Sequence, residues 1–348
     1  MRSFFALLCS ALICSCSSGG DKGPLTGPAG ASVSLMISSN DAMTSAGDTR
    51  AVTAVVTDAN GTVVSSPSVV WNTSAPAVAA VSETGSGATI TAVGDGTATI
   101  TATSGSTQGT VTVAVHRKLA SVVLSAPAPV LTIGSTMQLI ATGRDARQNP
   151  IPGLTGFLYS SSGPDKAVVS SSGLVSGLVS LSETPTATIT ATLTRDGITA
   201  GATTEITVRP PAGFDFAAFM LTEYERQTRV PTPGIGIAYF FVDGAKVNYI
   251  VTWSALSGPA ISAHIHGAAG ADDEADILVD LPIVGQTTNL GSITGSFTVA
   301  DIRSQNGHPV ITPGSLIELM RSSTAYVDVH TAAYAGGEIR GQTAGPFN

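Results

Sequence analysis

The heptapeptide TATITAT stands at residues 97–103 and recurs, letter for letter, at residues 186–192. Threonine alternates in it with alanine or isoleucine, and a period of two predicts a β-strand with one apolar and one polar face. An Asp-Ala pair recurs at nearly the same offset, at residues 58–59 and 145–146. Two ordered landmarks about ninety residues apart indicate a duplicated β-domain, because a repeat of this length is the size of one small sandwich.

The composition favours a chain built from several small β-domains. Of the 348 residues, 43% are hydrophobic, only 11% are charged and 38 are glycine. Because β-branched residues suit pleated surfaces and glycine marks frequent turns, we expect an all-β protein and not an α/β enzyme. The net charge of −8 argues against nucleic acid as a partner, since phosphate binding requires clustered lysine and arginine.

Seven short strands, separated by Gly, Asn and Pro turns, are expected in the first repeat. The text VVWNTSAPAVAAVSETG, with Trp71, and the text ITAVGDGTATITATSG, with Gly94 and Gly96, resemble the group 2 family of bacterial Ig-like domains. We therefore expect Ig-like β-sandwiches at 31–116 and 117–210, although the second lacks the tryptophan. The resemblance implies spacer or adhesive modules.

The N-terminal residues are typical of an export signal. Arg2 precedes an apolar run that is too short to span a bilayer as a helix. The text LICSCSSGGD resembles a bacterial lipobox, which implies cleavage before Cys16, lipidation of Cys16 and a membrane anchor. We thus predict a lipoprotein signal peptide at 1–15 and a Gly/Pro linker at 16–30, with an ordinary secretory signal as the alternative. All three cysteines lie within the first sixteen residues, so no disulfide within the mature chain is expected.

A third domain is expected at 213–348. The paired prolines of RPPAG mark its boundary, since proline cannot continue a strand ladder. The text SLIELMRS predicts one short helix at 315–322. Eight strands are predicted from the texts FDFAAFML, GIGIAYFFV, KVNYIVTWSAL, ISAHIHG, ADILVDLP, GSITGSFTV, TAYVDVHTA and GEIRGQT.

The order of these texts resembles the CHRD domain, a module named after chordin. The resemblance rests chiefly on AHIHGAAG, ILVDLP and YVDVHTAAYAGGEIRGQ, and it covers the whole segment. It implies an extracellular antiparallel β-sandwich with a binding role and no catalysis. The family-motif residues of this chain are Gly267, Gly337, Glu338, Arg340 and Gly341.

The text SAHIHGAAG raises the question of a metal site. In a strand, Ile261 would enter the core with its apolar neighbours, whereas His264 and His266 would share the opposite face, about 6.6 Å apart. His330 is placed similarly in a later strand. If the two strands are neighbours, three imidazoles converge, and imidazole suits both copper and zinc. The alternative is that the histidines are hydrogen-bonded to loop carbonyls or to Glu338.

Other candidate sites are weaker. The acidic text GADDEADI predicts a solvated turn, and its spacing matches no calcium loop. The chain has neither a glycine-rich phosphate loop between a strand and a helix nor a G-x-S-x-G nucleophile elbow, so we expect no enzyme.

Two hypotheses follow from the sequence. The first is a non-enzymatic bacterial lipoprotein, at the cell surface or in the periplasm, whose Ig-like domains present a CHRD domain to an extracellular protein or glycan. The second is an extracytoplasmic metalloprotein that binds copper or zinc through His264, His266 and His330.

Overall fold

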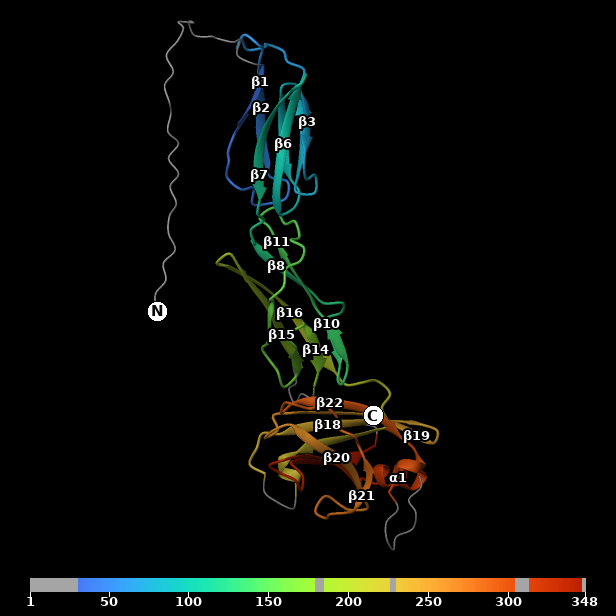
Figure 1. Ribbon diagram of the computed structural model, residues 1–348. Coiled ribbons are helices and arrows are strands. Elements are labelled where there is room, and N and C mark those ends of the chain that lie inside the picture. Colours follow the sequence, from blue (N-terminus) through green and yellow to red (C-terminus); the bar gives the residue numbers. More distant parts are fainter. Residues whose placement is uncertain (1–30, 179–184, 226–229, 304–312, 346–348) are drawn as a thin grey trace, which may run out of the picture. The chain divides into compact units, whose positions relative to one another are not determined.

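The computed structural model describes residues 31–178, 185–225, 230–303 and 313–345 (Figure 1). The predicted signal peptide at 1–15, Cys16 and the linker at 16–30 lie outside these residues. Within them the chain is all-β, as predicted, apart from one α-helix and two 3-10 turns. No helix of the described part is both long enough and apolar enough to cross a membrane.

Seven strands form two antiparallel sheets in the first Ig-like domain, in the orders β1-β2-β5-β4 and β3-β6-β7. TATITAT lies in β6, where Ala98, Ile100 and Ala102 are buried and the threonines between them are not. Trp71 is buried in the same core. The strands are β1 Ser32–Ile37, β2 Thr49–Thr57, β3 Val70–Thr73, β4 Ala79–Thr84, β5 Gly87–Ala92, β6 Gly96–Ser104 and β7 Thr107–Val115.

The second Ig-like domain repeats this strand chemistry. Its copy of TATITAT lies in β15, where Ala187, Ile189 and Ala191 are buried, and β15 forms a hairpin with β16 as β6 does with β7. The sheet orders are β10-β14-β13, β11-β8 and β12-β15-β16-β9. The strands are β8 Ser121–Ser125, β9 Val130–Thr132, β10 Thr136–Gln138, β11 Ile140–Arg144, β12 Leu158–Ser161, β13 Ala167–Val169, β14 Leu174–Gly177, β15 Thr186–Arg195 and β16 Ile198–Arg209.

All eight strands predicted for the third domain are present, and they form one antiparallel sheet in the order β21-β20-β23-β24-β17-β18-β19-β22. The predicted helix is α1, Pro313–Arg321. The strands are β17 Phe216–Leu221, β18 Ile235–Asp243, β19 Lys246–Ser254, β20 Ala260–Gly267, β21 Ile277–Asp280, β22 Gly291–Phe297, β23 Ala325–Thr331 and β24 Ile339–Ala344, and the 3-10 turns are Thr222–Tyr224 and Val299–Asp301.

One hydrophobic core holds this sheet together. Buried side chains from all eight strands and from α1 join the same cluster, whose largest fully buried members are Trp253 and Phe240. A single sheet whose strands all reach one core must curve around it, as in a barrel. The prediction that Ile261 enters this core is wrong: its side chain is 54% exposed, because the register of β20 against β23 shifts between Ala260 and Ser262.

Gly341 lets β24 approach β17 closely. A Cβ at this position would lie 2.1 Å from the carbonyl oxygen of Phe219, which belongs to the backbone of β17 and cannot rotate away. We therefore expect Gly341→Ala to destabilise the domain by about 3 kcal/mol through overpacking. Chemical denaturation of the full chain measures this.

Gly345→Ala is the matched control, since a Cβ there meets no atom within 4 Å. Its effect should stay within about 0.5 kcal/mol, as for most substitutions away from packed contacts. Equal stability of the two variants would contradict the close approach of β24 to β17.

Candidate functional site

The candidate site lies on the antiparallel strand pair β20 and β23. In their register His264 lies opposite Asp328, and His330 lies opposite Ser262. His266 follows two residues after His264 on the same face of β20. The residues between them, Ala263, Ile265, Val327 and Val329, are buried in the hydrophobic core. The three imidazoles therefore converge on the opposite side of the sheet from the core.

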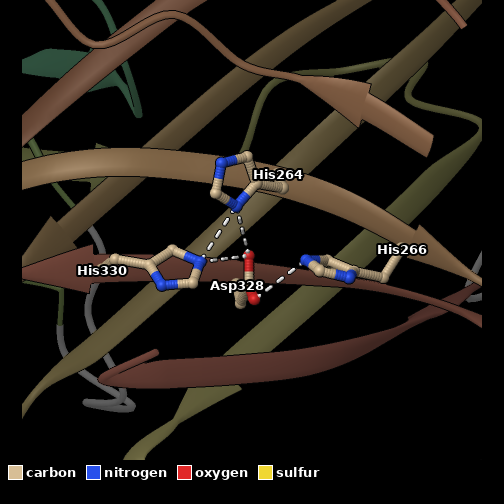
Figure 2. A group of neighbouring side chains, drawn as sticks. All are labelled: His264, His266, Asp328 and His330. Carbon is tan, nitrogen blue, oxygen red and sulfur yellow. Dashed lines mark hydrogen bonds and ion pairs between the residues drawn. The ribbon is translucent and has the colours of Figure 1, made fainter. Parts of the chain in front are cut away.

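Figure 2 shows the three imidazole rings arranged around the carboxylate of Asp328. One ligand atom from each of the four residues lies within 4.8 Å of the other three. Nε2 of His330 and Nε2 of His266 each lie 3.0 Å from a carboxylate oxygen. Nδ1 of His264 lies 2.9 Å from Nε2 of His330 and 3.4 Å from Oδ1 of Asp328. The group could hold a metal ion.

Loops cover the cluster, although it lies outside the core. His266, His330 and Asp328 are only 8%, 7% and 4% exposed. Backbone carbonyls of Ala275 and Ala335 contact the rings of His266 and His330 directly. The polar groups are therefore largely removed from water and must find partners in the protein.

Backbone carbonyls fix the protonation of two of the rings. Nδ1 of His266 donates to the carbonyl of Ala275 at 2.8 Å, and Nδ1 of His330 donates to the carbonyl of Ala335 at 3.0 Å. Because a carbonyl only accepts, Nδ1 carries the proton, and in the neutral ring Nε2 keeps its lone pair. Both lone pairs point into the cluster. This is the outer-shell arrangement usual for metal-binding histidines.

Two atoms of the cluster lack satisfactory hydrogen bonds. Nε2 of His266 and Oδ1 of Asp328 are buried, yet neither has a hydrogen bond of acceptable geometry. Burial alone would raise the pKa of Asp328, but its contacts with the three imidazoles outweigh this and hold the pKa well below its usual range. Asp328 is therefore a carboxylate at neutral pH. A cation among these atoms would satisfy them together.

A cavity of about 250 Å³ opens beside the cluster. Its lining residues include His266, Asp328 and His330 of the cluster, together with Glu225 and Arg340. Burial, with the negative charge of Asp328, raises the pKa of Glu225 to about 7. Oε1 of Glu225 is buried and has no hydrogen-bond partner.

Arg340 and Tyr326 support the site from the side. The ring of Tyr326 stacks on His266 with centroids 4.7 Å apart and planes 5° apart, and the guanidinium of Arg340 lies 3.5 Å from the Tyr326 centroid. Nη2 of Arg340 donates to the carbonyls of Gly270 and Asp273. Arg340 thus fixes both the ring that stacks on His266 and the loop that covers the site.

Glu338 has a different role from the histidines. Its buried carboxylate accepts hydrogen bonds from the backbone and hydroxyl of Ser257 and from the hydroxyls of Thr331 and Thr232. None of these hydrogen bonds comes from an imidazole of the cluster. The alternative expectation was that the histidines are hydrogen-bonded to loop carbonyls or to Glu338. His266 and His330 are hydrogen-bonded to loop carbonyls, whereas the hydrogen bonds to Glu338 come from serine and threonine.

The glycines of the family motif allow close packing. A Cβ at Gly337, where φ is +123°, would lie 2.4 Å from Oε1 of Glu225. A Cβ at Gly267 would lie 3.1 Å from the side chains of Leu278 and Leu319. These positions therefore shape the surroundings of the site and carry no ligand atoms.

Asp328 is the member of the cluster that sequence reasoning did not include. The available signal was strand alternation, which places Asp328 on the face of His330 in the text YVDVHT. The acidic turn of Asp272, Asp273, Glu274 and Asp276 is exposed. Among the described residues it forms no second group of converging metal ligands.

Solved structures of two adhesins and of an S-layer protein align with the chain at low similarity. The Yersinia pseudotuberculosis adhesin InvE is 14% identical, with a TM-score of 0.30, over 50% of this chain and 58% of InvE, so the chain spans little more than half of that structure. The Escherichia coli adhesin FdeC is 15% identical, with a TM-score of 0.27, over 94% of this chain and 99% of FdeC. Domains 4 and 5 of the S-layer protein SbsC are 17% identical, with a TM-score of 0.23, over 51% of this chain and 96% of that structure.

No curated protein sequence matches the chain. Residues 32–115 and 119–200 match the model of the bacterial Ig-like domain of group 2, and residues 216–343 match the model of the CHRD domain. Both matched families are the ones that the sequence resembled. The chain therefore carries two bacterial Ig-like domains of group 2 followed by a CHRD domain.

Proposed function

We propose that this protein is an exported bacterial lipoprotein whose Ig-like domains carry a copper- or zinc-binding CHRD domain. Cys16 bears the lipid, and His264, His266, Asp328 and His330 bind the ion. The observation that carries the proposal is the convergence of these four side chains within 4.8 Å, beneath loops that hold two of the rings.

The dimensions of the cluster support a coordinated ion. Around a tetrahedral ion with bonds of about 2.05 Å, neighbouring ligand atoms lie about 3.3 Å apart. In this cluster the separations are 2.9 Å between His264 and His330 and 3.0 to 3.4 Å from the rings to the carboxylate. The ligand atoms lie within 4.8 Å of one another, and the short contacts involve both oxygens of Asp328, so the side chains would have to draw closer together to form one coordination shell.

The donor types favour copper or zinc. Three imidazole nitrogens and one carboxylate suit borderline transition-metal ions, whereas calcium and magnesium take oxygen ligands. A divalent ion would also neutralise Asp328 and accept the lone pairs that the carbonyls of Ala275 and Ala335 direct inward. Protonated imidazoles could balance the charge of Asp328, but they would leave Nε2 of His266 without a well-formed hydrogen bond.

The proposal that the protein is exported and lipidated rests on the sequence. Cys16 stands in text that resembles a lipobox, and a linker rich in glycine and proline separates it from the first Ig-like domain. The Ig-like domains would then act as spacers between the membrane and the CHRD domain. Such an arrangement suits storage, delivery or capture of an ion or ligand outside the cytoplasm.

Metal content tests the ion site. The purified full chain, loaded with Zn²⁺ or Cu²⁺ and dialysed, should retain one ion, measured by inductively coupled plasma mass spectrometry. His264→Ala, His330→Ala and Asp328→Asn should each weaken binding at least about 10-fold, since loss of even an outer-shell partner has an effect of this size. His116→Ala, outside the cluster, should retain the ion. A dialysed wild type without metal would refute the ion site.

Acid should release the ion. Burial lowers the pKa of His330, but the hydrogen bond and negative charge of Asp328 outweigh it, so the pKa lies above its ordinary value. Protons therefore compete with the metal for His330 from above pH ~6.5, and affinity should fall as pH drops further because ligand imidazoles must be neutral. Equilibrium dialysis between pH 8 and pH 5, with a chelator buffer, measures this. Unchanged affinity over the range would contradict coordination by imidazole.

Membrane attachment tests the export half of the proposal. Expressed in a bacterium that makes lipoproteins, the wild type should enter the detergent phase and incorporate labelled fatty acid, because acyl chains supply the anchor. Cys16→Ser should abolish both. Cys14→Ser, two residues earlier in the same text, should retain both, and loss of labelling in Cys14→Ser alone would move the lipidation site.

A further inference from the structure

The cluster has one side that the protein leaves open. The 250 Å³ cavity is bordered by His266, Asp328 and His330, but His264 is not among its lining residues. An ion held by the four side chains would thus face the cavity on the side away from His264. Zinc expands from four to five ligands, and Cu²⁺ favours tetragonal shells, so both ions have room for another ligand there.

The cavity is sized for one functional group. A water molecule takes about 30 Å³ of liquid volume, whereas pockets for whole drug-sized ligands start at about 300 Å³. The 250 Å³ space therefore admits several waters or the end of a larger ligand that lies mainly outside it.

The charges of the walls select the occupant. Glu225, Glu274 and Asp328 are the acidic lining residues and Arg340 is the basic one. Above pH 7, where Glu225 is ionised, a divalent ion added to these four side chains brings their formal charge to zero, so an anion entering the cavity would leave an uncompensated charge in a half-enclosed site. The balance favours a neutral ligand.

Glu225 adds a directional requirement. Glu225 lines the cavity, and its Oε1 is buried without a hydrogen-bond partner. A buried acceptor of this kind costs free energy unless a donor reaches it. The fitting ligand therefore presents a lone pair to the ion and an O–H group to Glu225.

We propose that the metal centre keeps one coordination position open toward this cavity and binds there a neutral hydroxyl group that donates a hydrogen bond to the carboxylate of Glu225. Water is the occupant of the resting protein, and a hydroxyl group of a larger ligand would take the same place. The inference rests on the ion site proposed above. It makes the CHRD domain a metal-dependent receptor for hydroxyl groups.

Pulsed electron paramagnetic resonance of the Cu²⁺-loaded full chain tests the open position. The spectrum in D₂O should show exchangeable deuterons at the distance of a coordinated water. A chain that holds one Cu²⁺ but shows no such deuterons has a closed site, and the inference fails while the ion site stands. If the metal-content measurement finds no Cu²⁺ in the chain, both the ion site and the open position are refuted.

Azide, an anion that gives a charge-transfer band on binding Cu²⁺, tests the role of Glu225. At pH 8, above the pKa of about 7 of Glu225, replacing this residue by leucine removes a negative charge from the cavity wall, so Glu225→Leu should bind azide at least about 10-fold more tightly than the wild type. Glu274→Leu is the matched control: it removes the same charge from an exposed residue of the same cavity, and its effect should be smaller because water screens it.

Equal azide affinity of the wild type and Glu225→Leu would overturn the assignment of Glu225. Circular dichroism and copper content confirm that each variant is folded and loaded. The deuteron measurement needs no variant, so it decides the open position even where a substitution perturbs the fold.

Discussion

The antiparallel register between β20 and β23 is the constraint on which the site depends. Pairing His264 with Asp328 sets the ligands of both strands on one face, and the alternating residues anchor the same strands in the core. A slip of one residue would exchange the two sets and bury imidazoles among aliphatic side chains. The hydrophobic core thus fixes the position of the polar cluster, because Val327 and Val329 can occupy only the inner face.

Loops on the outer side of the sheet orient the side chains that the strands bring together. They supply carbonyls to Nδ1 of His266 and His330, and His266, Asp328 and His330 are at most 8% exposed. Arg340 holds one of these loops through two backbone carbonyls and also lies over Tyr326, which stacks on His266. Residues that bear no ligand atom therefore set the orientation of those that do.

Burying a charged side chain costs free energy unless it has polar partners, and the two buried carboxylates of this domain have partners of two kinds. Glu338 is buried in a ring of neutral donors from Ser257, Thr331 and Thr232, which satisfy its oxygens without a cation. Asp328 is surrounded instead by groups that titrate and bind metals. The neighbours of these two buried carboxylates therefore decide their chemistry. Glu338 joins neighbouring segments through hydrogen bonds, whereas Asp328 forms part of a potential ion site.

The sequence by itself determined the fold class, the number of strands in the first and third domains and the candidate histidines. Strand alternation in TATITAT and in AHIHG depends only on neighbours along the chain, and a period of two is readable there. It could not supply the exposed position of Ile261, the place of Asp328 in the cluster or the unpartnered carboxylate of Glu225. Those depend on which strands pair, in which register, and on which loops fold over them. Contacts between residues far apart in the chain are set by the packing of the whole domain, so only the tertiary structure decided them.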